Sequence, residues 1–208
     1  MARIQREQYI TINIYVEGRR TEQIYFNNYT RQINSSQKYR LNVKYYCSDL
    51  KKTIDYIDDE IRDSDKNDVF YFVFDTDIIS KSELINIYTN VQNRNTKCEL
   101  LNAEIDKINL IYSTPCFEYW FLLHYKKCTD SFGDCSGVIN KLNNYIVGYN
   151  KAIDYFDILL DKQVDAIRNA KWVEMDHKTQ GHIEFTTEFS PYTSVYQLVE
   201  ILNKFNRV

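Results

Sequence analysis

The sequence contains few of the residues that make linkers. Only two prolines and five glycines occur among 208 residues, and no repeat or low-complexity segment stands out. A flexible linker between domains is therefore not expected. Hydrophobic residues make up 44% of the chain, which is ordinary for a globular protein. The length suits one domain with a sizeable core, or one domain with an appendage.

No segment of the sequence is suited to a membrane. No stretch approaches the roughly 20 consecutive apolar residues that a spanning helix needs. The first residues, MARIQREQY, lack the apolar centre of a secretory signal. We therefore expect a cytoplasmic protein with no membrane partner.

Paired cysteine motifs are also absent. The number of cysteines is odd and no CxxC pair occurs, so reduced thiols are the simple expectation in a cytoplasm. His124, Cys128 and Cys135 could suggest zinc, but a scattered trio without paired ligands is a weak signal, and free thiols are favoured. The five cysteines are Cys47, Cys98, Cys116, Cys128 and Cys135.

The chain lacks an excess of positive charge and a nucleotide-binding loop. Its formal net charge is -3, so electrostatic attraction alone would not bring it onto nucleic acid. A polynucleotide would need a local basic patch, a bound metal ion or a partner protein. No glycine-rich GxxxxGK loop occurs, which argues against the chain being its own ATPase.

The apolar pattern alternates between strands and helices in the first part of the chain. This alternation predicts an α/β fold with an open, mainly parallel sheet and helices on both faces. The run VFYFVF has the length and composition of a central strand that is buried on both faces. We predict strands at residues 9–16, 41–47, 69–74 and 108–112, and helices at residues 21–33, 49–62, 80–91 and 116–125.

The second part of the sequence is mostly helical in pattern. Helical spacing covers residues 138–146 and 152–168, and a polar loop follows at residues 176–187. Ser190 and Pro191 have the pattern of a helix start, which predicts a terminal helix from that point. We therefore predict an α/β core over residues 1–127 and a helical cap over residues 128–208 that closes back on it.

Three carboxylates follow predicted strands. Glu17 ends the first strand, Asp75 ends the third, and Asp77 is two residues further on. A flavodoxin-like order would place these strands side by side, so that the carboxylates converge at their carboxyl ends. Converging carboxylates repel one another, and a divalent cation such as Mg²⁺ removes that repulsion. Each residue could equally be a simple loop or cap residue.

Four segments of the chain resemble motifs of the RloB-like family. The resemblance covers nearly the whole sequence, with the four motifs in the family's order. Thr114 and Ser190 stand where the family pattern has asparagine. The matching segments are residues 17–26 for EGxxTExxYF, residues 74–77 for FDxD, residues 114–124 for NPxFExWLLLH and residues 190–195 for NPxTxV.

This resemblance implies a toprim-like fold, the metal-dependent module shared with topoisomerases, primases and OLD-family nucleases. It also implies a role in prokaryotic phage defence or abortive infection, often beside an ATPase partner. Glu17 would then be the general acid/base or metal-associated glutamate, and Asp75 and Asp77 would be ligands of Mg²⁺ or Mn²⁺. No further acidic residue follows in residues 78–80, which puts a third ligand from this loop in doubt.

Two residues of the fourth predicted helix are further candidates. Glu118 could face the acidic cluster and help to hold metal, or it could satisfy the helix terminus. His124 could contact a phosphate, although a histidine at a helix end is more often structural. Glu22 fits a first-turn helix carboxylate and needs no other role.

Four basic residues could meet a substrate phosphate. Arg19 and Arg20 follow Glu17 at a predicted helix entry, where either a phosphate contact or a solvated turn is reasonable. Lys151 and Lys171 lie in the predicted cap and could reach over the site, although a solvated face is the simpler reading.

Two functions from different classes follow. The first is a metal-dependent nuclease effector that cleaves phosphodiester bonds of nucleic acid, in an anti-phage system with an ATPase partner. The second is a non-catalytic module that senses or docks an ATPase, which the missing third acidic residue and the negative charge favour. A nucleotidyl or phosphoryl transferase is a third class, and it would use the same divalent metal site as the nuclease.

Overall fold

The computed structural model describes residues 10–35, 39–46, 68–77, 79–100, 108–186 and 188–205. The helix predicted at residues 49–62 lies outside these ranges. Within them, the strands are β1 (Ile10–Val16), β2 (Tyr39–Tyr45), β3 (Val69–Asp75), β4 (Ile108–Thr114) and β5 (Tyr192–Thr193).

The strands form one open sheet in the order β2-β1-β3-β4-β5. The pairs β1–β2, β1–β3 and β3–β4 are parallel, and only the short β5 is antiparallel to its neighbour β4. The predicted α/β class and mainly parallel sheet are therefore confirmed. The order also places β1 beside β3, which brings the carboxyl ends of these two strands together.

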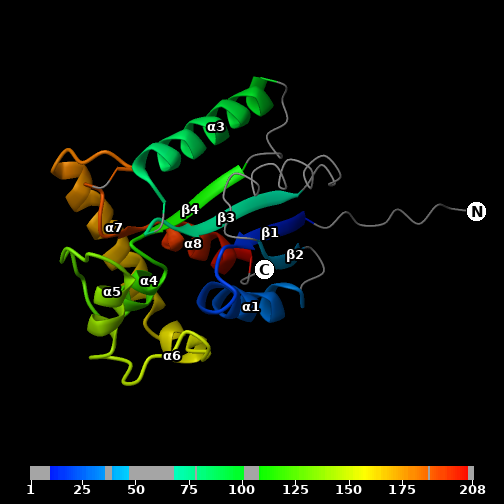
Figure 1. Cartoon of the computed structure of the whole chain (residues 1–208). Helices are drawn as coiled ribbons and strands as arrows, with labels where there is room; N and C mark the ends of the chain where they lie inside the picture. The colour runs from blue at the N-terminus through cyan, green and yellow to red at the C-terminus, as the bar shows by residue number, and fades with distance from the viewer. Residues whose placement is uncertain are drawn as a thin grey trace, which may run out of the picture.

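The central strand β3 is buried on both faces because its side chains alternate between two apolar clusters. Phe70, Phe72 and Phe74 pack with one cluster, in which α3 (Lys81–Leu100) covers the sheet. Tyr71 and Val73 pack with the other, which contains residues of α1 (Thr21–Ile33) and α8 (Val195–Phe205). Figure 1 shows α3 on one side of the sheet and α1 with α8 on the other.

The second half of the chain is mainly helical among its described residues. The predicted helix at residues 152–168 is in fact two helices, and the predicted loop at 176–187 begins later, because α7 runs to Thr179. One apolar cluster holds residues from Ile12 to Leu202, so it spans both sides of the predicted boundary near residue 128. The division into two domains stays a prediction. These helices are α4 (Glu118–Leu123), α5 (Cys135–Leu142), α6 (Phe156–Leu160) and α7 (Gln163–Thr179).

The predicted start of the terminal helix at Ser190 and Pro191 is wrong. The chain stays extended through β5, and α8 begins at Val195. Ser194 explains the difference, because its backbone N–H donates to the Tyr112 carbonyl at 2.9 Å and its Oγ accepts from the Tyr112 N–H at 2.9 Å. Pairing with the edge of the sheet therefore outweighs the local helix-start signal.

Side chains protect the remaining edge of β4. The Asn95 amide accepts from the Ile108 N–H at 3.0 Å and donates to the Ile108 carbonyl at 2.9 Å, as a neighbouring strand would. Ser194 does the same for Tyr112 at the other end. An open strand edge can pair with another chain, so these contacts limit such pairing.

Asn95→Ala is expected to destabilise the protein by about 1–3 kcal/mol, because it leaves two backbone groups of Ile108 without their partner. Asn90→Ala is a matched control, since Asn90 is exposed on the same helix. Urea unfolding of both variants measures the difference. Equal midpoints for the two would show that Asn95 contributes nothing at this edge.

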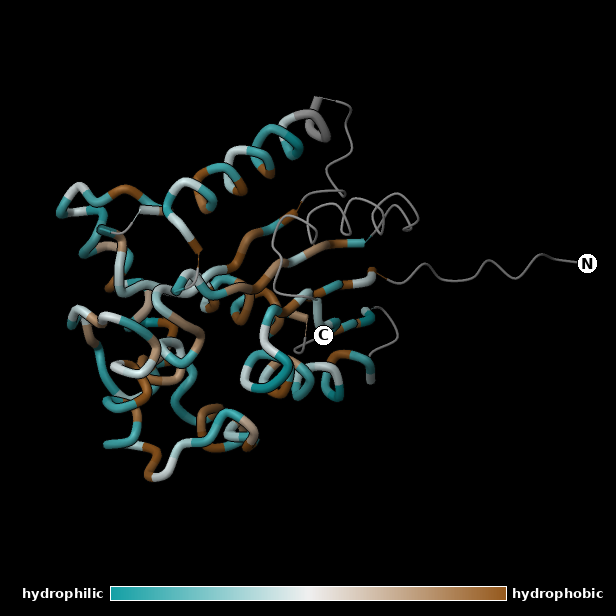
Figure 2. The backbone as a smooth tube through the Cα atoms, in the orientation of Figure 1, coloured by the Kyte–Doolittle hydropathy of each residue, from teal (hydrophilic) through white to brown (hydrophobic). Residues whose placement is uncertain are grey.

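Hydrophobic residues are concentrated along the central strands, whereas the helices around them carry many hydrophilic positions (Figure 2). No described helix combines the length and apolar character that crossing a bilayer requires.

Candidate functional site

The carboxylates predicted at the strand ends lie at one edge of the sheet. The Glu17 N–H donates to the Val73 carbonyl at 3.1 Å, which continues the pairing of β1 with β3 by one residue. The Glu17 side chain then turns toward β3, where its Oε2 accepts a hydrogen bond from the Asp75 N–H at 3.2 Å. Asp77 is exposed just beyond β3. The parallel order of the strands is what brings Glu17 and Asp75 together.

Glu22 joins this edge, which the sequence analysis did not foresee. It lies in the first turn of α1 and is buried. Its carboxylate folds back over the chain at Gly18, where an added Cβ would lie only 1.9 Å from Glu22 Oε2. A side chain at position 18 would therefore displace the Glu22 carboxylate from this place. The spacing of Glu17, Gly18 and Glu22 in the first motif was the available signal.

Burial and mutual repulsion raise the pKa of several carboxyl groups at this edge. Desolvation raises the pKa of Asp75 well above its usual range, and the charges of Glu22, Glu118, Asp77 and Glu17 raise it further. Desolvation also raises the pKa of Glu22 to about 7, with a contribution from Glu118. The pKa of Glu17 is raised by burial and by Asp77. These carboxylates therefore form one electrostatic cluster, which favours protons or cations.

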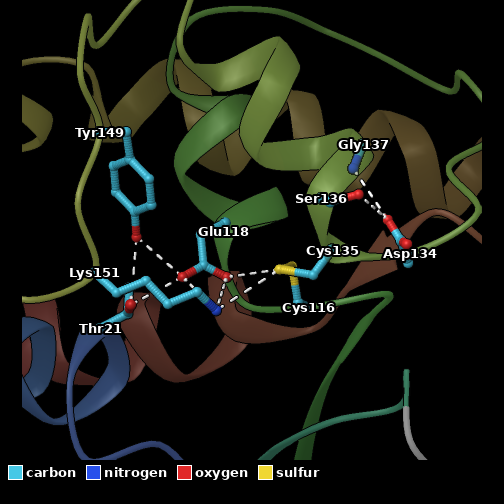
Figure 3. The surroundings of a disulfide bond; sticks show 9 residues. All are labelled: Thr21, Cys116, Glu118, Asp134, Cys135, Ser136, Gly137, Tyr149 and Lys151. Atoms are coloured by element: carbon cyan, nitrogen blue, oxygen red, sulfur yellow. Dashed lines mark hydrogen bonds and ion pairs between the residues drawn. A yellow bond between two sulfur atoms is a disulfide. The ribbon is translucent and has the colours of Figure 1, made fainter.

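Glu118, the first residue of α4, is almost fully buried and is held by three donors (Figure 3). Its Oε1 accepts hydrogen bonds from Thr21 Oγ1 at 2.9 Å and from the Tyr149 hydroxyl at 3.0 Å. Lys151 Nζ lies 3.1 Å from Oε1 and 3.2 Å from Oε2. The Lys151 ammonium therefore pairs with the Glu118 carboxylate, and a role of Glu118 in holding metal stays a prediction.

The same contacts fix the Lys151 ammonium beside Glu118. Although burial works against it, the Glu118 carboxylate raises the pKa of Lys151, so the side chain is fully charged at neutral pH. Lys151 is still 43% exposed, while Glu118 is 1% exposed. Of the four predicted basic residues, Lys151 is thus the one tied to the acidic edge, through Glu118.

The other predicted phosphate-binding residues have separate surroundings. The Arg19 guanidinium lies over the Tyr45 ring, 4.2 Å from its centroid, and Arg20 is exposed just before α1. Lys171 pairs with Glu200 of α8 at 2.6 Å. His124 is buried, and its Nδ1 donates to the Trp120 carbonyl at 2.9 Å. These contacts favour structural or surface roles for His124 and Lys171, and the phosphate role of all four stays a prediction.

The lowered pKa of buried His124 predicts how its contribution to folding stability changes in acid. Burial lowers its pKa to about 4, from 6.5. The unfolded chain therefore binds a proton at this position more readily between these values, so the contribution of His124 to stability is lost as pH falls from 6.5 to 4. The loss is up to about 3 kcal/mol, since one unit of pKa difference corresponds to about 1.4 kcal/mol.

Urea unfolding at pH 7, 5.5 and 4 measures this loss, with His124→Asn as the comparison. Asparagine can keep the bond to Trp120 but does not titrate. The stability of the wild type relative to the variant should therefore decrease as the pH falls. Parallel curves for the two proteins would contradict the assignment.

The expectation of reduced thiols is wrong for two cysteines. Cys116, just before α4, and Cys135, the first residue of α5, form a disulfide with their Cα atoms 5.5 Å apart. Cys128 is a buried free cysteine. Cys47 and the side chain of Cys98 lie outside the described residues. Chain folding brings two cysteines together that are 19 residues apart in sequence, which a count of cysteines could not reveal.

The ligand atoms at the strand ends are spread more widely than in a filled metal site. Among the described residues, Cys116, Glu118 and Cys135 are the only set of three or more His, Cys, Asp or Glu residues with ligand atoms all within 4.8 Å of one another. Mg²⁺ keeps several of its waters and often uses only one or two carboxylates directly. The oxygen donors and the mutual repulsion of Glu17, Asp75 and Asp77 fit such a hydrated ion.

Comparison with known proteins agrees with the motifs. No curated protein and no solved structure matches the chain. The model of the family described as "RloB-like protein" matches residues 12–202, which run from β1 into α8 and include every residue of the acidic edge. The chain belongs to the RloB-like protein family.

Proposed function

We propose that the protein is a nuclease that depends on a divalent metal ion and cleaves phosphodiester bonds of nucleic acid. The observation that carries the proposal is the contact of Glu17 with Asp75 at the ends of β1 and β3, within a cluster of carboxylates of raised pKa. Glu17, Asp75 and Asp77 would hold Mg²⁺ or Mn²⁺. Once bound, such an ion would supply positive charge beside the phosphate and would favour ionisation of a water.

The remaining residues have roles that follow from their positions. Glu17 is half-buried and has a raised pKa, which suits a group that accepts a proton from the attacking water. Glu118 is saturated by Thr21, Tyr149 and Lys151, so it acts as a positioning residue between α1 and α4. Lys151 belongs to this network and is partly exposed, so it could also meet a phosphate.

Membership of the family supports the biological setting of the proposal. The enzyme would be an effector of prokaryotic phage defence, restrained by an ATPase partner until infection is sensed. The partner would also help to bring nucleic acid to a chain whose own net charge is -3.

The test is incubation of the purified protein with total cellular RNA and with plasmid DNA, in Mg²⁺, in Mn²⁺ and in chelator. Each mixture is run with and without the proposed ATPase partner. Glu17→Ala is compared with Asp157→Ala, which removes an exposed carboxylate from α6. Cleavage that needs metal, survives Asp157→Ala and is lost in Glu17→Ala is the expected result. It also identifies the polymer.

A non-catalytic module that docks an ATPase is the second candidate. The wide spacing of the carboxylates and the Lys151 ammonium beside Glu118 favour it, because both reduce the need for a metal ion. Tight binding of the ATPase by wild type and Glu17→Ala alike, with no cleavage in any mixture, would support this candidate over the nuclease.

A further inference from the structure

The disulfide lies directly against the Glu118 network (Figure 3). Cys116 is fully buried, whereas Cys135 is partly exposed at the start of α5. The bond therefore joins a buried sulfur to one that solvent can reach. An accessible cysteine beside a second, resolving cysteine is the usual arrangement of a thiol that undergoes reversible oxidation.

Two groups meet at one oxygen of Glu118. Cys135 Sγ lies 3.2 Å from Glu118 Oε2, and Lys151 Nζ lies 3.2 Å from the same oxygen. Lys151 Nζ is also 3.7 Å from Cys135 Sγ. The sulfur and the ammonium are thus neighbours that lie beside the same carboxylate oxygen.

We propose that Cys116 and Cys135 are a reversible thiol–disulfide modification site that sets how firmly Glu118 holds Lys151. In the oxidation, two S–H bonds break and one S–S bond forms. The two protons and two electrons pass to hydrogen peroxide, which becomes two waters. A dithiol reverses the step and is itself oxidised to a disulfide.

The redox state of Cys135 affects the ion pair between Glu118 and Lys151 because it decides whether the Cys135 sulfur carries a proton. A disulfide sulfur has no proton, so in the oxidised protein Lys151 is the donor that satisfies Glu118 Oε2. After reduction, Cys135 has an S–H group that can donate to the second lone pair of this oxygen, which lowers the negative charge that attracts Lys151. Reduction therefore loosens Lys151, whose partly exposed side chain can then swing into solvent.

The consequence for catalysis rests on the proposed function. A loosened Lys151 is free to meet a phosphate of the substrate, so the reduced protein would be the more active form. The proposed disulfide chemistry and its effect on the ion pair between Glu118 and Lys151 do not depend on cleavage of nucleic acid.

The first part of the test counts thiols in the full chain after treatment with hydrogen peroxide or with dithiothreitol, followed by denaturation. The reduced chain should show all five thiols, and oxidation should remove two of them. Peptide mapping should find the bond between Cys116 and Cys135. Oxidised protein without this bond would overturn the proposal.

The second part measures how fast an amine-reactive acetyl ester modifies Lys151 in the native protein, by mass spectrometry. Lys171, which pairs with Glu200, is the internal reference. Lys151 should react about fivefold faster or more in the reduced protein, the lower end of usual coupling between sites. In Cys135→Ser the rate should be the same after either treatment.

An unchanged Lys151 rate despite a formed disulfide would overturn the coupling. Neither part uses metal or nucleic acid. A failure of the nuclease proposal would therefore appear separately, as absent cleavage in both redox states.

Discussion

Asp75→Asn is expected to abolish cleavage and at the same time to raise the thermal unfolding midpoint measured in chelator. The first effect follows from the loss of a predicted metal ligand, and we expect a fall of at least about a hundredfold, since even residues that only orient ligands often cost that much. The second follows because the Asp75 carboxylate is desolvated and faces the charges of Glu22 and Glu118. A neutral amide of the same shape removes that repulsion.

The combination of effects separates a functional carboxylate from a structural one. Most substitutions of buried residues destabilise a protein, so a gain in stability with a loss of activity marks a site kept for its chemistry. Asp157→Asn makes the same chemical change on an exposed part of α6 and should alter neither property. A lower unfolding midpoint for Asp75→Asn would show instead that the carboxylate makes stabilising contacts in the metal-free protein.

The sequence was sufficient to predict the positions of Glu17 and Asp75 because they depend on topology. Alternating strands and helices predict a parallel sheet, and the carboxyl ends of parallel strands meet at one edge. Once β1 lies beside β3, the residues that follow them must be neighbours. The local sequence pattern and the general geometry of parallel sheets were therefore enough to predict that Glu17 and Asp75 lie close together.

The Glu118 network could not be predicted in the same way. Thr21 and Glu118 are 97 residues apart, and Tyr149 is a further 31 residues along the chain. No periodic pattern links such positions, so only the packing of α1 against α4 and the following loop reveals them. The disulfide was missed for the same reason, since redox compartment and cysteine number say nothing of which sulfurs meet.

The start of α8 shows how tertiary contacts override a correct local rule. Ser followed by Pro is a sound helix-start signal, yet Tyr192 and Thr193 pair with β4 instead. The backbone N–H and C=O groups of Tyr112 at the sheet edge need partners, and Ser194 provides them. The predicted terminal helix nevertheless exists, and its buried face carries Val195, Leu198, Val199 and Leu202.

Glu22→Gln is expected to stabilise the metal-free protein by up to about 3 kcal/mol at pH 8, and by little at pH 4.5. The pKa of Glu22 is about 7 in the folded protein, against 4.5 as the ordinary value. Between these values the Glu22 carboxylate binds a proton more readily in the folded state than in the unfolded state, so its contribution to wild-type stability falls as pH rises through this window. Each unit of pKa difference corresponds to about 1.4 kcal/mol, which gives the upper limit.

The variant carries no titrating group at position 22, so its advantage over the wild type should grow from pH 4.5 to 7 and then level off. Urea unfolding in chelator at four pH values measures this difference directly. Glu83→Gln on the exposed first turn of α3 should show no such growth. A difference between Glu22→Gln and wild type that is constant with pH would mean that Glu22 is ionised at no cost, and the acidic edge would then have no need of a proton or a cation.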